Sequence, residues 1–162
     1  MTRMTSIERA LTSPQIAGAR ALFREYADAL GVDLGFQDFE HEMQDLPGAY
    51  APPMGAIFLA RTDAVFTGCV AVRPLDAETA EMKRLYVRPE ARDQGLGRRL
   101  ARAAIDHSRD VAFRRIRLDT LPQMGQALAL YESLGFRPIA PYRYNPVPGT
   151  SYLELALVRE EG

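Results

Sequence analysis

The segment with the clearest chemistry is Arg92-Asp93-Gln94-Gly95-Leu96-Gly97, which precedes a stretch with helical periodicity. The first turn of a helix carries unpaired backbone N–H groups and the positive end of the helix dipole, so it binds anions. Gly95 and Gly97 allow a phosphate group to approach the backbone closely. Arg92 and Arg98 add positive charge around the same place. The spacing therefore predicts a phosphate-binding loop, although a helix start that only needs a tight turn would look similar.

Spacing argues against two other nucleotide-binding loops. A Walker loop requires Gly-x-x-x-x-Gly-Lys-[Ser/Thr], and the sequence contains no such run. A dinucleotide fingerprint requires a third glycine where this chain has Leu100. A nucleotide-binding protein of another type stays an alternative, which displacement of a bound ligand by ATP or NAD would reveal.

The composition narrows the class of ligand. The chain has 162 residues and a net charge of -1, which argues against a general nucleic-acid binder. Basic residues nevertheless outnumber acidic ones between Lys83 and Asp119, which suits a small polyanion, although most of these arginines also fit solvated faces. Cys69 is the only cysteine and lies in a strand-like run, so we expect a buried thiol rather than a nucleophile. With no signal peptide and no membrane-spanning run, a cytoplasmic protein without a membrane partner is expected.

Hydrophobic periodicity predicts one α/β domain over residues 1–162, with a mostly antiparallel first part and a later strand–helix–strand crossover. A helix is expected to start at Ser13-Pro14, with Ser13 as its cap, and to stop at Gly31. Further helices are predicted over residues 36–46, 95–109 and 123–134. Strands are predicted over residues 5–11, 56–61, 64–73, 79–87, 115–118 and 151–158, with a loop over 141–148.

Three segments in this order resemble the GNAT superfamily of acetyltransferases: Leu85-Tyr86-Val87-Arg88-Pro89, the loop at 92–97, and Ala127-Leu128-Ala129-Leu130-Tyr131-Glu132-Ser133-Leu134-Gly135-Phe136. The match is close over residues 81–139. It implies a bent mixed sheet whose central parallel strands splay apart, flanked by helices, with acetyl-CoA in the gap. The diphosphate would take the amides of residues 94–98, and the pantetheine would pair with the backbone of Leu85 and Val87. The implied cofactor-binding residues are Leu85, Tyr86, Val87, Arg92, Asp93, Gln94, Gly95, Leu96, Gly97 and Arg98. The family often has Asn where this chain has Met124.

The same resemblance implies direct acyl transfer without a covalent enzyme intermediate or a metal. Tyr131 is the candidate acid near the cofactor sulfur, whereas a structural tyrosine would bond its hydroxyl to a backbone group. Glu81 is the candidate base, with a pKa raised in a cleft; alternatively it is a carboxylate paired with Lys83 or Arg84. Strand alternation predicts that Glu81, Lys83, Leu85 and Val87 share one face. The amide of Val87 would polarise the thioester carbonyl.

The acceptor site is less defined by the sequence. The first helices and the last strands shape it in this family, which makes Phe36, Tyr50, Tyr142, Tyr144 and Asn145 its candidate substrate residues, with Phe39 beside them. Acidic residues nearby would hold a cationic amine; the candidates are Glu40, Glu42 and Asp45. These patterns leave open the acceptor, acetyl or longer acyl donors, N- or O-transfer, a homodimer through the closing strand, and a non-catalytic acyl-CoA sensor.

Overall fold

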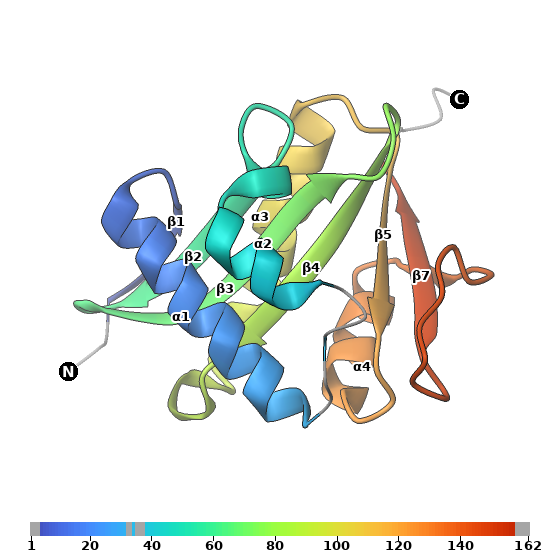
Figure 1. The fold of residues 1–162 in the computed structure, drawn as a ribbon. Coiled ribbons are helices and arrows are strands. Elements are labelled where there is room, and N and C mark those ends of the chain that lie inside the picture. Colours follow the sequence, from blue (N-terminus) through green and yellow to red (C-terminus); the bar gives the residue numbers. More distant parts are fainter. Residues whose placement is uncertain (1–3, 32–33, 35–37, 158–162) are drawn as a thin grey trace.

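The computed structural model describes residues 4–31, 34 and 38–157, and its elements follow the predicted order (Figure 1). The helices are α1 (Ser13–Leu30), α2 (Phe39–Asp45), α3 (Leu96–Asp110) and α4 (Gly125–Ser133), with short 3-10 turns η2 (Gly48–Tyr50) and η3 (Pro89–Ala91). The strands are β1 (Thr5–Arg9), β2 (Ala56–Thr62), β3 (Val65–Pro74), β4 (Thr79–Val87), β5 (Arg115–Thr120), β6 (Arg137–Pro138) and β7 (Ser151–Ala156).

The strands form one mixed sheet in the order β1-β2-β3-β4-β5-β7-β6. Strands β1 to β4 are antiparallel neighbours, and β4 and β5 are parallel. The parallel pairing extends only from Thr79↔Arg115 to Glu81↔Arg117, after which both strands continue without pairing to each other. Figure 1 shows β4 and β5 diverging above α4. The splayed, mixed sheet expected from the resemblance is therefore confirmed.

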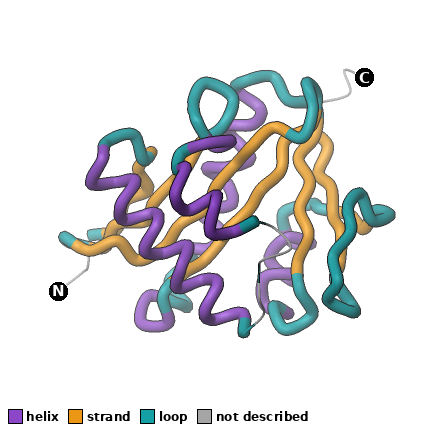
Figure 2. The backbone as a smooth tube through the Cα atoms, viewed as in Figure 1, coloured by secondary structure: helices purple, strands orange, loops and turns teal. Residues whose placement is uncertain are grey.

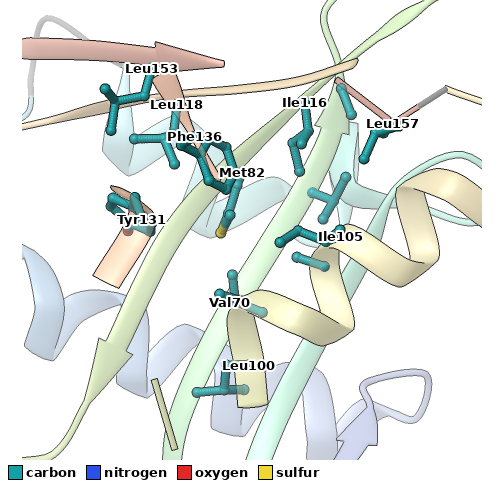
Figure 3. Close-up of a cluster of buried hydrophobic side chains, with 14 of the residues drawn as sticks. Val70, Met82, Leu100, Ile105, Ile116, Leu118, Tyr131, Phe136, Leu153 and Leu157 are labelled. Atoms are coloured by element: carbon teal, nitrogen blue, oxygen red, sulfur yellow. The ribbon is translucent and has the colours of Figure 1, made fainter. Parts of the chain in front are cut away.

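Helices cover both faces of the sheet (Figure 2). One face packs against α3 in a core that includes Val70, Met82, Leu100, Ile105 and Tyr131 (Figure 3). The other packs against α1 and α2 in a second core, whose members include Leu22, Phe23, Phe39, Met43 and Tyr50. The candidate site lies where the two parallel strands separate between these cores. No helix in the described part of the chain has the length and apolarity needed to cross a bilayer.

The ends of α1 show how side chains set the helix bounds. Thr12 is the N-cap: its hydroxyl accepts from the amide of Gln15 at 3.3 Å, and the Gln15 side chain accepts from the Thr12 amide at 3.0 Å. The prediction of Ser13 as the cap is therefore wrong by one residue, because Ser13 already lies in the helix. Gly31 ends the helix with φ 66°, as its lack of a side chain favours.

Other element bounds differ from prediction by a few residues. Helix α4 begins at Gly125 rather than at residue 123, because residues 121–124 form a turn in which the Met124 amide donates to the Leu121 carbonyl at 3.0 Å. Strand β5 extends to Thr120 because β7 pairs with it throughout. The first residues of the helix predicted over 36–46, and the end of the strand predicted over 151–158, lie outside the described residues. Strand β7 lies between β5 and β6 in the sheet. A homodimer formed by pairing β7 with a second copy would therefore meet β6 along part of that edge.

Candidate active site

The predicted phosphate loop has the backbone of an anion site. Asp93 and Gly95 are left-handed, with φ 64° and 75°, and Gly95 is the N-cap of α3. No described side chain caps this end of the helix. A Cβ placed on Gly95 would have no atom within 4 Å, and one on Gly97 would meet only Leu130, at 3.5 Å. The first-turn amides of α3 are therefore open to a ligand, with Arg92 and Arg98 beside them.

The end of β4 presents free backbone edge to the gap. Arg88 donates its amide to Thr67 of β3 at 2.8 Å, so the amide and carbonyl of Val87 face the opposite direction, toward β5. Leu85, two residues earlier, has the same orientation. This geometry suits strand-like pairing with a pantetheine chain. The Val87 carbonyl, however, already accepts from the Arg92 side chain at 3.0 Å, which leaves the Val87 amide for the ligand.

A bulge in β4 divides the predicted site between the two faces of the sheet. Ala71 pairs with Lys83 but Cys69 pairs with Tyr86, so β4 carries one residue more than β3, and Arg84 has φ 63°. Leu85 and Val87 consequently join Met82 in the α3-side core. Glu81 and Lys83 lie on the α1 and α2 side. The prediction that Glu81, Lys83, Leu85 and Val87 share one face is therefore wrong.

Glu81 is fully buried and surrounded by donors. Its carboxylate accepts from Arg73 at 2.8 Å, pairs with Arg143, and accepts from the Tyr142 hydroxyl at 2.8 Å. Burial raises the pKa of Glu81, but Lys83, Arg143 and Arg73 outweigh it and hold the pKa below its usual value. The predicted direction was the opposite. Arg73 and Arg143 form ion pairs with Glu81, and Lys83, one of the two predicted partners, supplies the largest favourable charge.

Tyr131 projects from α4 into the α3-side core and lies edge-on to Phe136, with ring centroids 5.7 Å apart (Figure 3). Within the described residues its hydroxyl has no hydrogen-bond partner, unlike that of a structural tyrosine. Burial raises the pKa of Tyr131, so the phenol is protonated at neutral pH. A protonated phenol without a fixed partner can donate its proton to a ligand.

A cavity of about 30 Å³ marks the place where β4 and β5 separate, and we call it the gap cavity. It is lined by Tyr26, Met82, Lys83, Arg84, Leu85, Asp119, Thr120, Met124 and Tyr131. Met124, which directly precedes α4, therefore lies at the predicted cofactor site. The gap cavity brings the candidate acid into contact with residues from both sides of the β4 bulge.

A larger hollow of about 230 Å³, which we call the α2 pocket, lies beside it. It is lined by Asp38, His41, Glu42, Asp45, Pro47, Gly48, Ala49, Tyr50 and Arg73. Glu42 also holds Arg84 through two 3.0 Å contacts, so this ion pair separates the α2 pocket from the gap cavity. Of the predicted acidic residues, Glu42 and Asp45 line the α2 pocket, whereas Glu40 pairs with Arg24 outside it.

The predicted substrate residues have different positions. Tyr50 lines the α2 pocket and Tyr142 contacts Glu81. Asn145 donates to Asp119 of the gap cavity at 3.3 Å. Tyr144 is 81% exposed and lines neither the gap cavity nor the α2 pocket, and Phe36 lies outside the described residues. Phe39 belongs to the buried core rather than to a pocket wall.

Three basic residues of the site had no place in the predictions: Arg73, Lys83 as a cavity residue, and Arg143. Arg73 lies opposite Glu81 on β3, in a register that a strand pattern does not reveal. Arg143, which pairs with Glu81, comes from the loop after β6 and lies 62 residues after Glu81 in the chain. Cys69, in contrast, is buried as predicted; burial raises the pKa of its thiol, and the thiol donates to the Arg84 carbonyl at 3.2 Å.

Comparisons with known proteins agree with this architecture. The family model described as "Acetyltransferase (GNAT) family" matches residues 19–136. An uncharacterised N-acetyltransferase of Schizosaccharomyces pombe is 39% identical over 140 residues, which cover 85% of this chain and 86% of the relative. An uncharacterised N-acetyltransferase of Escherichia coli is 30% identical over 78% of this chain and 77% of its own.

Solved structures show the same fold. A Klebsiella pneumoniae protein assigned as an acyl-CoA N-acyltransferase has 27% identity and a TM-score of 0.72, over 96% of this chain and 99% of its own. A Salmonella typhimurium protein solved with its cofactor acetyl-CoA has 21% identity and a TM-score of 0.67, over 98% and 96% of the two chains. The splayed sheet, the loop at the start of α3 and the sequence relatives lead to one conclusion: the chain belongs to the GNAT family of acetyltransferases.

Proposed function

We propose that this protein transfers an acetyl group from acetyl-CoA directly to a primary amine of a small molecule or peptide. The observation that carries the proposal is the open N-terminus of α3, which adjoins the unpaired edge of β4. One feature suits a diphosphate and the other an extended amide-containing chain, and coenzyme A contains both. Acetyl-CoA in the related Salmonella structure supports this choice of donor.

The backbone gives each end of such a ligand a separate contact. The amides of residues 94–98, with Arg92 and Arg98, would hold the diphosphate, and the amides of Leu85 and Val87 would hold the pantetheine. The Val87 amide would also polarise the acyl carbonyl. Acetyl-CoA itself supplies an activated acyl group. Because the residues that line the gap cavity are buried or half-buried, they would limit the access of bulk water to that group.

Tyr131 is proposed to donate its proton to the departing thiolate. It lines the gap cavity and its hydroxyl has no competing partner among the described side chains. Glu81 remains on the acceptor side of the sheet, but its lowered pKa suits a positioning residue better than a base. Through Tyr142 and Arg143 it ties the loop after β6 to β4, and through Arg73 it would position one wall of the α2 pocket.

The reacting amine would lie at the gap cavity, beside Lys83 and Tyr131, and the α2 pocket is proposed to hold the remainder of the acceptor. Asp38 and Asp45 form no ion pair with any described residue, and the buried Tyr50 hydroxyl has no hydrogen-bond partner there. A buried hydroxyl without a partner costs about 1–3 kcal/mol, which a polar ligand group would recover. The α2 pocket therefore favours acceptors with a polar or cationic group beyond the reacting amine.

The test is titration of the purified protein with acetyl-CoA by calorimetry, followed by thiol release across a panel of amines. Binding with thiol release for at least one amine is the expected result. Absence of binding would overturn the proposal. Binding of acetyl-CoA without thiol release across a broad panel of amines, with neither measurement changed by Tyr131→Phe, would instead indicate an acyl-CoA sensor. Displacement of acetyl-CoA by ATP or NAD would indicate a different nucleotide ligand.

A further inference from the structure

The proposed reaction needs a group that takes a proton from the acceptor, and Glu81 is poorly suited to that role. Its carboxylate is already shared among Arg73, Arg143 and Tyr142, and these donors stabilise its charged form. A carboxylate with a lowered pKa is a weak proton acceptor at neutral pH. Another titratable group on the same face of β4 is therefore the better candidate.

Lys83 is that group, and the sequence singles it out. The chain has 20 Lys and Arg residues, of which 19 are Arg and one is Lys83. Arginine keeps its proton at any pH that a protein meets, whereas lysine can lose it when buried. Among these 20 residues, Lys83 is therefore the one able to become neutral, and it lies within the candidate active site; of the two histidines, His41 on α2 and His107 on α3, neither lines the gap cavity. We infer, on the basis of the proposed function, that Lys83 takes the proton from the acceptor amine.

The position of Lys83 supports this assignment. It is only 7% exposed, and it lines the gap cavity together with Met82 and Tyr131. It lies two residues after Glu81, beyond the last parallel pair between β4 and β5. The β4 bulge directs it to the acceptor side, while Leu85 and Val87 face the α3-side core. A proton acceptor and a proton donor therefore line one cavity from different elements.

The charged surroundings of Lys83 combine three guanidinium groups with three carboxylates. Arg84 follows it on β4, Arg73 approaches from β3, and Arg143 from the loop after β6. The anions are Glu81 on β4, Asp119 on β5 across the gap cavity, and Glu42 on α2, which is bound to Arg84. The phenols that face the cavity are Tyr26 of α1 and Tyr131 of α4.

These surroundings disfavour a proton on Lys83. Burial has the largest effect and Arg84 the next, and against the opposing charge of Glu81 they lower the pKa of Lys83 to about 7. Neutral Lys83 is therefore well populated at physiological pH. A base with a pKa near the working pH combines availability with sufficient basicity.

The proton balance is closed by Lys83 and Tyr131. Neutral Lys83 takes one proton from the acceptor ammonium and passes it to solvent. The freed amine nitrogen forms a bond to the acyl carbon, and the carbon–sulfur bond breaks. The thiolate takes the phenolic proton of Tyr131, and the second proton lost by the nitrogen restores that phenol. One amide, one thiol and one solvent proton result.

Because Lys83 is the only lysine, its titration can be measured directly. Protein labelled with ¹³C-lysine should give one lysine Cε resonance, with a midpoint near 7. A midpoint near the ordinary value of about 10.4 would overturn the inference. In Glu81→Gln the midpoint should fall, because Glu81 raises the pKa of Lys83. The fall in rate on the acidic side of the pH–rate profile should move to lower pH by the same amount in Glu81→Gln. If Glu81 were the base, that acidic limb would be lost in this variant.

Kinetics of two substitutions separate proton transfer from charge. Lys83→Met should lower kcat/KM at pH 7 by about 10²–10⁴-fold and abolish the acidic limb. Lys83→Arg keeps the charge but cannot accept a proton, so it should be equally impaired. With acceptors whose weakly basic amines are already neutral at pH 7, the fall in kcat/KM of both variants should be smaller. Activity retained in Lys83→Arg, or an unchanged pH–rate profile in a folded Lys83→Met, would overturn the proton-accepting role of Lys83 and leave the proposed acetyl transfer standing. Lack of thiol release by wild-type protein would overturn the proposed function as well.

Discussion

Replacing Gly97 by Ala should separate the stability of α3 from its capacity to bind a diphosphate. Gly97 is the second residue of α3 and has an ordinary helical backbone. A new Cβ would meet only Leu130, at 3.5 Å, which is a normal contact. Since Ala favours a helix over Gly by about 0.8–1.0 kcal/mol, the free energy of unfolding should rise by up to that amount.

The same methyl group should weaken acetyl-CoA binding. A phosphate that reaches the first-turn amides must approach the backbone where the methyl group lies. Hydrogen bonds to charged groups contribute about 1.5–3 kcal/mol each. Loss of one such bond corresponds to roughly a 10- to 150-fold increase in Kd, since 1.4 kcal/mol is a factor of ten. Gly97→Val should weaken binding further.

Urea unfolding and calorimetric titration with acetyl-CoA measure the two effects separately. Gly95→Ala is the matched control, because Gly95 has φ 75° and a side chain there is strained by about 1–2 kcal/mol. Gly95→Ala should therefore lower stability while Gly97→Ala raises it. A stable Gly97→Ala protein with unchanged acetyl-CoA affinity would refute the assignment of the loop.

Three further predictions test the acid, the helix cap and the buried carboxylate. Tyr131→Phe should reduce kcat by about 10²–10⁴-fold with little change in acetyl-CoA affinity, as steady-state kinetics and calorimetry would show; unchanged kcat would exclude the acid role. Thr12→Ala should lower the free energy of unfolding by about 1 kcal/mol in urea, and Ser13→Ala should change it little; equal effects would contradict the observed cap. Glu81→Gln should have a lower free energy of unfolding than wild type, with the largest difference above about pH 5. That difference should shrink as pH falls, because Glu81, whose pKa is lowered in the folded protein, stabilises the fold only while its carboxylate is charged. A difference independent of pH in urea unfolding would show that the charge of Glu81 contributes nothing.

Local patterns were sufficient to predict most of the fold. Strand β4 has the predicted bounds, and α3 begins one residue after its predicted start, because alternation and glycine act over a few residues. The cap of α1 shows the limit of such patterns. Thr12 and Ser13 both favour N-caps, and only the three-dimensional reach of the Thr12 hydroxyl to the Gln15 amide distinguishes them.

The open helix start at residues 92–97 was predictable for the same reason, since six consecutive residues determine it. The surroundings of Glu81 were not. Its partners come from β3 and from a loop 62 residues downstream, and their approach depends on the register of the sheet. The pKa of Glu81 was consequently predicted in the wrong direction: burial was foreseen, but the converging guanidinium groups were not.

The β4 bulge has the largest consequence for function, and strand alternation hides it. Arg84 is held in a left-handed conformation that costs a residue with a side chain about 1–2 kcal/mol, while its guanidinium makes a two-point ion pair with Glu42. Without the extra residue, Lys83 and Leu85 would lie on one face. With it, Leu85 and Val87 face the α3-side core, where the Leu85 backbone and the Val87 amide would be available to a pantetheine, and Lys83 lies on the opposite face of the strand. The strained residue thus separates the proposed acetyl-CoA contacts from the proposed proton acceptor of the same strand, while Leu85 and Lys83 both line the gap cavity with Tyr131.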